Sequence, residues 1–456
     1  MIPSHIFREY DIRGLHETEL TDEAAGAVGH AFGTLTRRAG GRRVALGWDV
    51  RPSSVRLAAG AERGMVASGL EVERVGVAPT PALYYAVASR LLDGGMQITG
   101  SHNPPEFNGF KMTKGKLPLY GAEIQEMRAL IERGDFERGT GSAADRPVLD
   151  EYRAMLVERL RSPKGLTVVM DCGNGCAGTV VPETFELMGH RVFPLFAELD
   201  GGFPNHLPDP TVPSLLVALQ AEVKRRGADL GIGFDGDADR IGAVDANGRI
   251  VWGDQLLALL ARDVLSRVPG ARIIFDVKCS QGLKEDIEAH GGQPEMWKTG
   301  HSLLKSRLHE TGAPLAGEMS GHMFFSEGYF GFDDALFAAG RLLRYVAATG
   351  KTFAGLVDSI PHYFATPEIR IACPEERKFA VVEELKREFS GRYRVIDIDG
   401  VRVEFGDGWG LVRASNTQPV LVVRFEARSP ERLDEIRAFF MKPLERLGVT
   451  GAVAGH

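Results

Sequence analysis

Three aspartates at alternating positions mark the part of this sequence best suited to hold a cation. Asp235, Asp237 and Asp239 come directly after a strand-like run of small and apolar residues. Three carboxylates crowded into one loop repel one another unless a hard cation binds there. An EF-hand calcium loop needs glycine at its sixth position and glutamate at its twelfth, where this chain has Arg240 and Ala246. The pattern predicts a magnesium site with room for a phosphate oxygen, and a solvated acidic turn is the alternative.

A second polar segment presents a hydroxyl, an imidazole and a carboxamide in succession, at Ser101, His102 and Asn103. No G-x-S-x-G elbow surrounds Ser101, which disfavours a Ser-His-Asp hydrolase. An ordinary polar turn is the alternative, because serine, asparagine and proline are common turn residues. If Ser101 faces the three aspartates, it can instead carry a phosphoryl group, since in-line transfer needs a positioned acceptor and a cation beside the moving charge.

A third segment near the C-terminus combines one guanidinium with hydroxyls and an amide, at Arg413, Ser415, Asn416 and Thr417. Arginine matches phosphate oxygens bidentately, and hydroxyl and backbone N–H groups supply further donors. The segment therefore predicts an anion clamp. A polar turn before a buried strand is an equally good interpretation.

A fourth segment places Glu318 two residues before Ser320, between two strand-like runs. If the chain is extended there, the two side chains project to the same side and suit two neighbouring sugar hydroxyls. A plain hairpin turn is the alternative.

The elements around these segments predict several domains. Three apolar runs end in an aspartate and a small-residue turn before a helical pattern, at residues 44–49, 167–171 and 272–276. This alternation is typical of α/β units, and the runs lie roughly one domain length apart. The last ninety or so residues differ, with strands expected at 369–373, 393–398 and 420–426 and helices at 376–388 and 430–447. We therefore expect three similar mixed α/β domains (1–146, 147–250 and 251–362) and a smaller C-terminal α+β domain (363–456).

Composition excludes several classes of protein. The 456 residues are 44% hydrophobic and 25% charged, which is typical of a chain that buries real cores. The net charge of -7 provides no basic field for nucleic acid or an anionic membrane. The sequence contains no long apolar run, and charges interrupt its N-terminus, so we expect a cytoplasmic protein. The four cysteines do not form a disulfide framework and suggest buried structural thiols.

Taken in this order, the four polar segments resemble the α-D-phosphohexomutase superfamily over essentially the whole chain, and most of all its bacterial phosphomannomutase/phosphoglucomutase branch. Residues 7–14 and 108–111 match as well. The resemblance implies four domains around a central active-site cleft. It also implies that Ser101 is phosphorylated and that one Mg²⁺ is bound by the three aspartates together with one phosphoserine oxygen.

The resemblance further implies two groups of site residues. The expected catalytic group is Ser101, His102, Arg13, Lys111, Arg240 and His301. The expected substrate-binding group is Tyr10, Lys278, Glu318, Ser320, Arg413, Ser415, Asn416, Thr417 and Arg424. Arg13, Lys111 and His301 are all candidates for the group that moves the hydroxyl proton.

The implied reaction interconverts hexose 1-phosphates and hexose 6-phosphates, of mannose or glucose, through a hexose 1,6-bisphosphate that reorients in the cleft and also serves as activator. A phosphoglucosamine mutase of the same superfamily and a metal-dependent sugar phosphatase are alternatives, and a calcium- or sugar-phosphate-binding protein is the non-enzymatic one. The expected partners are small hexose phosphates, with no nucleic acid and no membrane. The expected assembly is a monomer or a small homo-oligomer.

Overall fold

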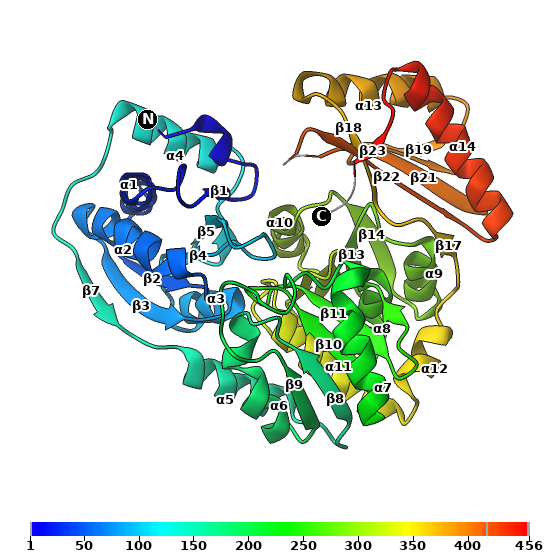
Figure 1. Cartoon of the computed structure of the whole chain (residues 1–456), viewed down its shortest axis with the longest axis horizontal. Coiled ribbons are helices and arrows are strands. Elements are labelled where there is room, and N and C mark those ends of the chain that lie inside the picture. Colours follow the sequence, from blue (N-terminus) through cyan, green and yellow to red (C-terminus); the bar gives the residue numbers. More distant parts are fainter. Residues whose placement is uncertain (1, 416–417, 454–456) are drawn as a thin grey trace.

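We describe the fold from a computed structural model, which covers residues 2–415 and 418–453. These residues form four β-sheets in succession along the chain, each with its own helices (Figure 1). The first and fourth sheets lie on opposite sides of the second and third (Figure 1). The prediction of three α/β domains followed by a C-terminal domain of a different kind is confirmed.

The first sheet is mixed, and its central strands β2, β4 and β5 are buried on both faces. The strands are β1 (Ile12–Leu15), β2 (Arg43–Trp48), β3 (Glu71–Val77), β4 (Gly94–Ile98), β5 (Phe107–Lys114), β6 (Leu117–Pro118) and β7 (Ser142–Asp145). Their order is β1-β5-β4-β2-β3-β7, with β6 beside β5. The helices are α1 (Asp22–Arg38), α2 (Pro52–Ala67), α3 (Thr80–Ser89) and α4 (Ala122–Arg133), after a short 3-10 turn at Ser4–Ile6. Along β2, Val44 and Leu46 pack with α1 and α2, whereas Ala45 packs with α3, as the two-residue period of a strand requires.

The second and third sheets share one continuous hydrophobic core. The second contains β8 (Thr167–Asp171), β9 (Arg191–Leu195), β10 (Leu230–Phe234), β11 (Ile241–Asp245) and β12 (Ile250–Val251), in the order β12-β11-β10-β8-β9. The third contains β13 (Arg272–Asp276), β14 (Gln293–Trp297), β15 (Leu315–Gly317) and β16 (Met323–Phe325), in the order β14-β13-β15-β16. The accompanying helices are α5 (Leu149–Leu160), α6 (Val181–Leu187), α7 (Val217–Arg226), α8 (Gly253–Leu265), α9 (Gln281–Ala289), α10 (His301–Thr311), α11 (Ala335–Thr349) and α12 (Phe353–Asp358).

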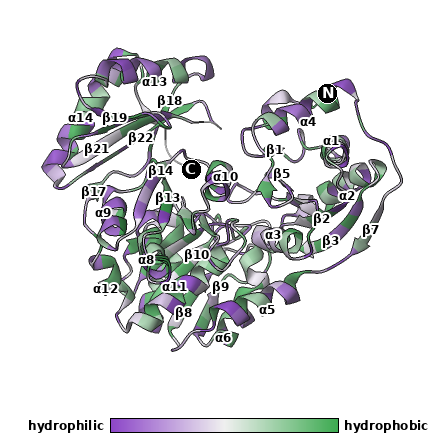
Figure 2. Ribbon diagram, turned by 180° about the vertical axis from the view of Figure 1, so that it is seen from behind, coloured by the Kyte–Doolittle hydropathy of each residue, from purple (hydrophilic) through white to green (hydrophobic). Residues whose placement is uncertain are grey.

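The fourth sheet is antiparallel and packs against two long helices. Its strands are β17 (Phe364–Ala365), β18 (Ile369–Ala372), β19 (Arg394–Ile396), β20 (Val401–Glu404), β21 (Gly408–Ala414), β22 (Val420–Ala427) and β23 (Ala452–Val453). The helices α13 (Glu375–Phe389) and α14 (Pro430–Arg446) contribute apolar side chains to one core with these strands. Figure 2 shows hydrophobic strands such as β22 beneath helices whose outer residues are hydrophilic. The predicted elements of this region are confirmed to within about three residues at each end.

The four polar segments all lie between neighbouring antiparallel strands. Residues 99–106, the serine loop, connect β4 to β5, and residues 235–240, the aspartate loop, connect β10 to β11. Residues 318–322, which we call the sugar-recognition turn after their expected role, connect β15 to β16. Residues 413–419, which we call the phosphate-binding loop after their expected role, begin at the end of β21 and lead into β22. The hairpins place one polar loop at an end of each sheet.

Two sequence predictions concern the whole chain. All four cysteines lie in the described part of the chain, where they are buried and form no disulfide. Within residues 2–415 and 418–453, the longest apolar helices fall short of what crossing a membrane requires.

Candidate active site

Ser101 is buried at the tip of the serine loop with a backbone that serine rarely adopts. Its φ angle is +49°, in the left-handed region, and the residue is 1% exposed. Such a conformation costs on the order of 1 kcal/mol and persists only where neighbouring groups fix it. Arg51 supplies that fixation, because its guanidinium donates to the carbonyl oxygens of Ser101 (2.9 Å) and Pro104 (2.6 Å).

Asp49 completes this support from the end of β2. Its Oδ2 accepts hydrogen bonds from Thr99 Oγ1 at 2.9 Å and from the Gly100 N–H at 3.1 Å, and it pairs with Arg51 Nε at 3.1 Å. Both Asp49 and Arg51 are almost fully buried. Neither residue was identified from the sequence, although Asp49 ends one of the three strand-aspartate-turn patterns.

The aspartate loop reaches the serine loop directly. The hydroxyl of Ser101 donates to Asp235 Oδ2 at 2.8 Å, while Asp235 Oδ1 accepts the N–H groups of Asp239 and Arg240, each at 3.0 Å. Gly236 allows this approach, because a Cβ atom there would lie 2.4 Å from the carbonyl oxygen of Ser101. The fold therefore brings the Ser101 hydroxyl directly against the aspartate loop.

The other two aspartates share a buried lysine. Lys111 Nζ donates to Asp237 Oδ2 at 2.8 Å and also contacts Asp239 Oδ2, and Thr80 Oγ1 donates to Asp237 Oδ2 at 2.5 Å. The second oxygens, Asp237 Oδ1 and Asp239 Oδ1, are buried and accept no hydrogen bond from the described residues. One oxygen from each of the three aspartates can be chosen so that all lie within 4.8 Å of one another. Buried unsatisfied carboxylate oxygens at this spacing fit a hard cation.

Burial and neighbouring charges shift the pKa values of three side chains around the two loops. Burial, together with the charges of Asp239 and Asp237, holds the pKa of Asp235 well above its usual range. Burial opposes the charge on Lys111, but the two aspartates it contacts raise its pKa well above the usual value. His102 lies 3.2 Å from Ser101 Oγ through Nδ1, and burial with the nearby charges of Arg240 and Arg13 lowers its pKa well below 6.5.

The sugar-recognition turn differs from its predicted geometry. Residues 318–322 are not extended, because the Gly321 N–H bonds back to the Glu318 carbonyl at 3.0 Å and closes a turn. The extended geometry considered for Glu318 and Ser320 is therefore absent, and both residues lie in a hairpin turn between β15 and β16. Glu318 and Ser320 still meet, because Ser320 Oγ donates to Glu318 Oε2 at 3.3 Å. Burial raises the pKa of Glu318.

Four further predicted residues lie beside the sugar-recognition turn, the start of α10 or the serine loop. Arg240 Nε lies 3.0 Å from His322 Nε2, which joins the aspartate loop to the sugar-recognition turn. His301 begins α10, and its ring stacks on His322 at 5.3 Å between centroids. The hydroxyl of Tyr10 donates to the carbonyl of Thr299 at 3.0 Å, so the first domain touches the start of α10. Arg13 donates to Asn103 Oδ1 of the serine loop at 3.3 Å and pairs with Asp11 at 2.6 Å.

The C-terminal domain places its predicted residues in two groups. Arg413 stands at the end of β21 rather than in a loop, and its Nε donates to Asp399 Oδ2 at 3.0 Å. Ser415 follows it, and Ser415 Oγ accepts the Gln418 N–H at 3.2 Å. Asn416 and Thr417 lie outside the described residues. Arg424 and Lys278 meet at the base of this domain, where the Arg424 guanidinium contacts the Lys278 carbonyl and Lys278 Nζ bonds Glu368 at 3.1 Å.

A buried charge cluster behind His322 was also missed from the sequence. Asp333 lies 3.2 Å from His322 Nδ1, 3.7 Å from His301 Nδ1 and 2.7 Å from Lys305 Nζ. His322 belongs to the fourth polar segment, but nothing in the spacing of the sequence links it to Asp333 or Lys305. His322 Nδ1 also lies 3.6 Å from Asp239 Oδ1, so His322 stands between Asp333 and the aspartate loop.

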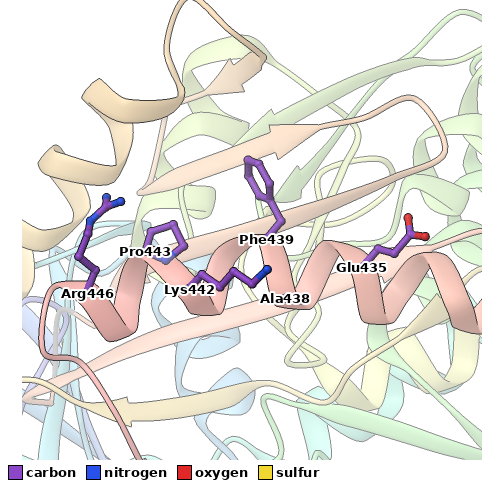
Figure 3. Close-up of a pocket in the computed structure, with 6 residues that line it drawn as sticks. All are labelled: Glu435, Ala438, Phe439, Lys442, Pro443 and Arg446. Atoms are coloured by element: carbon purple, nitrogen blue, oxygen red, sulfur yellow. The ribbon is translucent and has the colours of Figure 1, made fainter.

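A surface depression of about 510 Å³ lies elsewhere, along the outer side of α14 (Figure 3). Six residues line it: Glu435, Ala438, Phe439, Lys442, Pro443 and Arg446. They include none of the predicted site residues, so the depression is separate from the four polar loops.

Comparison with known proteins agrees with this arrangement. Models of phosphoglucomutase/phosphomannomutase alpha/beta/alpha domains I, II and III match residues 4–138, 150–248 and 252–364, and the model of the C-terminal domain matches residues 368–442. The chain belongs to this family. The family resemblance, the fold class and the prediction of an isomerase are confirmed.

Full-length relatives support the assignment to the phosphoglucomutase/phosphomannomutase family. The phosphomannomutase/phosphoglucomutase of Pseudomonas aeruginosa is 46% identical over 447 residues, which cover 97% of this chain and 96% of that protein. The phosphoglucomutase of Neisseria gonorrhoeae is 44% identical over 449 residues, covering 97% of each chain. A crystal structure of a phosphoglucomutase/phosphomannomutase family protein from Burkholderia thailandensis superposes with a TM-score of 0.94 at 41% identity and 99% coverage of both chains.

Proposed function

We propose that this protein interconverts hexose 1-phosphates and hexose 6-phosphates of glucose and mannose, with Ser101 as the phosphoryl carrier. The observation that carries the proposal is the position of the buried Ser101 hydroxyl, 2.8 Å from Asp235 in a loop of three buried aspartates. Family membership supplies the substrate class. We propose that the chain divides into four domains at residues 1–146, 147–250, 251–362 and 363–456. We also propose that the protein acts in the cytoplasm.

The proposed reaction consists of two transfers that balance each other. In the first, the bond between phosphorus and Ser101 Oγ breaks while the free hydroxyl of a hexose monophosphate bonds to phosphorus and loses its proton. The resulting hexose 1,6-bisphosphate turns over in the cleft. In the second transfer, its other phosphate returns to Ser101 Oγ, and the sugar oxygen that is left regains a proton. Added hexose 1,6-bisphosphate serves as activator because it phosphorylates Ser101 in the same way.

Magnesium is the cation that we propose for the aspartate loop. Asp235, Asp237 and Asp239 offer only oxygen atoms, two of which have no hydrogen-bond donor among the described residues. Carboxylate oxygens of this kind are the ligands that magnesium prefers, and a phosphoserine oxygen would add one more ligand. When bound, magnesium supplies positive charge next to the transferring phosphoryl group.

The surrounding side chains have distinct proposed roles. Lys111 and Arg240 provide fixed positive charge beside the aspartates, and His102 orients the Ser101 oxygen. Arg13, Lys111 and His301 remain the three candidates for the proton-transfer group, and burial lowers the pKa of the His301 imidazole well below 6.5. Arg13 lies against the serine loop as a charged donor.

Substrate binding is assigned to the remaining predicted residues. Glu318 and Ser320 bind sugar hydroxyls from the sugar-recognition turn, and Tyr10 closes the cleft beside them. The phosphate that is not reacting is bound by Arg413, Ser415, Asn416 and Thr417, with Lys278 and Arg424 at the base of the same domain. A clamp on a separate domain lets the bisphosphate reorient without leaving the cleft.

The test is phosphorus NMR of the protein with magnesium and a trace of hexose 1,6-bisphosphate. Mannose 1-phosphate, glucose 1-phosphate and glucosamine 1-phosphate are each added separately. We expect 6-phosphates from mannose and glucose. Inorganic phosphate alone would indicate a phosphatase, and turnover of glucosamine 1-phosphate alone would indicate a phosphoglucosamine mutase.

A pair of serine variants tests the phosphoryl carrier. Ser101→Ala should abolish mutase turnover, because it removes the hydroxyl that lies 2.8 Å from Asp235. Ser89→Ala, at the exposed end of α3 in the same domain, should retain it. Wild-type turnover in the Ser101→Ala protein would overturn the proposed mechanism.

A further inference from the structure

The turn at residues 299–300, just before α10, has contacts to three domains. The Thr299 carbonyl accepts the Tyr10 hydroxyl at 3.0 Å, and the Thr299 N–H donates to Asp399 Oδ2 at 3.0 Å. The Gly300 N–H donates to Glu318 Oε1 at 2.7 Å. Tyr10 belongs to the first domain, Glu318 to the third and Asp399 to the C-terminal domain. We call Thr299 and Gly300 the junction turn.

The junction turn links these partners through shared peptide groups. The Thr299 carbonyl and the Gly300 N–H belong to one peptide, so Tyr10 donates to its oxygen while Glu318 accepts from its nitrogen. Hydrogen bonds at both ends of one peptide strengthen each other. Gly300 has a φ of +136°, and a Cβ atom there would lie 2.6 Å from the Tyr10 ring, so only glycine permits this packing.

Asp399 connects the junction turn to the phosphate-binding loop. One oxygen, Asp399 Oδ2, accepts both the Thr299 N–H and Arg413 Nε, each at 3.0 Å. Asp399 comes from the segment between β19 and β20, one hundred residues away from Thr299 in the sequence. A single carboxylate therefore fixes the Arg413 guanidinium relative to the turn that bonds Glu318.

The base of the C-terminal domain is attached to the third domain by other contacts. The Arg402 guanidinium donates to the carbonyls of Val277 (2.8 Å) and Cys279 (3.0 Å), and the Gln281 N–H donates to Glu426 at 2.8 Å. These contacts do not involve Arg413 or Glu318. Loss of Asp399 should therefore leave the domain attached at its base while releasing Arg413.

We propose that Asp399 is a positioning residue for hexose phosphate binding. Through the junction turn, it fixes the position of the phosphate-binding Arg413 relative to the sugar-binding Glu318. The inference rests on the proposed function for the roles of Arg413 and Glu318. A hexose phosphate presents its phosphate and its sugar hydroxyls at a fixed separation, so both groups must be held at a matching distance. Asp399 sets that distance when the C-terminal domain is docked.

The kinetic test compares Asp399→Ala with Asp397→Ala. Asp397 lies two residues earlier and pairs at 2.7 Å with Lys386, away from the junction turn. We expect Asp399→Ala to raise KM for hexose 1-phosphate by about tenfold, the effect of losing one charge-assisted hydrogen bond, with a smaller change in kcat. Asp399→Asn, which keeps an acceptor oxygen, should lie between the wild type and alanine. An unchanged KM, or an equal loss in Asp397→Ala, would overturn the proposal.

A second kinetic measurement separates positioning from general damage. Phosphoryl transfer from phosphorylated Ser101 to free glucose does not use the phosphate clamp, so its slow rate should be the same in wild type and Asp399→Ala. Transfer to glucose 1-phosphate should fall by about tenfold at limiting substrate. An equal fall for both acceptors would mean that Asp399 supports the fold rather than the clamp.

Hydrogen exchange tests the junction turn without any enzymatic activity. The peptide that contains the Thr299 amide should exchange about tenfold faster in Asp399→Ala than in wild type or in Asp397→Ala. Unchanged exchange would refute the bond to Asp399. If the wild type shows no mutase turnover, the proposed function fails, and this measurement still decides whether the junction turn is formed.

A double-mutant cycle with Tyr10→Phe tests whether the junction turn couples the domains. Tyr10→Phe removes only the hydroxyl that bonds the Thr299 carbonyl. If the junction turn transmits the coupling, the combined effect with Asp399→Asn on kcat/KM should differ from the product of the single effects by at least about threefold. Multiplicative effects would show that Tyr10 and Asp399 act independently.

Discussion

Removing the Arg51 guanidinium should test how the serine loop is held. Arg51 is 1% exposed and donates to the carbonyls of Ser101, Asn103, Pro104 and Phe107. It also pairs with the buried carboxylate of Asp49 at 3.1 Å. Arg51→Met fills a similar volume but leaves these acceptors without their donor. We therefore expect a large loss of stability in the first domain and a displaced Ser101.

The size of the effect follows from the burial of the groups. Breaking a buried ion pair by removing one partner costs about 3–5 kcal/mol, and each buried carbonyl left without a donor adds about 1–3 kcal/mol. Rearrangement of the loop recovers part of this, so we expect a net loss of about 5 kcal/mol. At about 2–4 °C per kcal/mol, the melting temperature of the first domain should fall by roughly 10 °C or more.

The assay is differential scanning calorimetry together with mutase turnover. Arg43→Met is the matched control, because Arg43 lies on β2 and pairs with Glu73 at 2.8 Å while remaining half exposed. Exposed pairs of this kind contribute about 0.2–1 kcal/mol, so the control should melt close to the wild type. A fall of less than about 3 °C in Arg51→Met would refute the reasoning, because it would mean that the serine loop keeps its conformation without the guanidinium.

Three further predictions concern other parts of the chain. Lys378→Met should raise KM for hexose 1-phosphate by about tenfold, since buried Lys378 Nζ donates to the Ser415 carbonyl at 2.5 Å, whereas Lys386→Met on the exposed side of the same helix should leave KM unchanged. Asp237→Asn should raise the magnesium concentration for half-maximal turnover by at least about tenfold, and an unchanged requirement would reject Asp237 as a ligand. Burial lowers the pKa of His190 to about 4, so between pH 6.5 and 4 the unfolded chain binds a proton that the folded chain does not, and stability falls as the pH drops through this window. His190→Gln should show a flatter decline in urea midpoint over that range, and an identical pH profile would contradict the assignment.

Local sequence patterns determined which residues could do chemistry and which elements would present them. Alternating carboxylates after an apolar strand indicate a cation loop, because charge repulsion and strand burial are properties of neighbouring residues. Asp49, Asp171 and Asp276 likewise indicated from the local sequence where a strand ends and a turn begins. These patterns, with the family resemblance, were sufficient for the four-domain order.

The geometry of two segments depended on contacts that local patterns do not contain. Glu318 and Ser320 meet across a turn, because a backbone hydrogen bond closes residues 318–321, and not because a strand projects them to one side. Arg413 stands on β21, where pairing with β22 continues to Ala414. In both cases backbone hydrogen bonds within the hairpin decided the local geometry.

Only the tertiary structure decided which of these residues meet. Ser101 and Asp235 are 134 positions apart, Lys111 and Asp237 are 126 apart, and Thr299 and Asp399 are 100 apart. Such pairs form where the loops of different domains pack together, and hydrophobic periodicity within one element carries no information about that packing. The sequence by itself determined the chemical groups and their local elements, whereas domain packing determined that a serine, three aspartates and a lysine form one buried site.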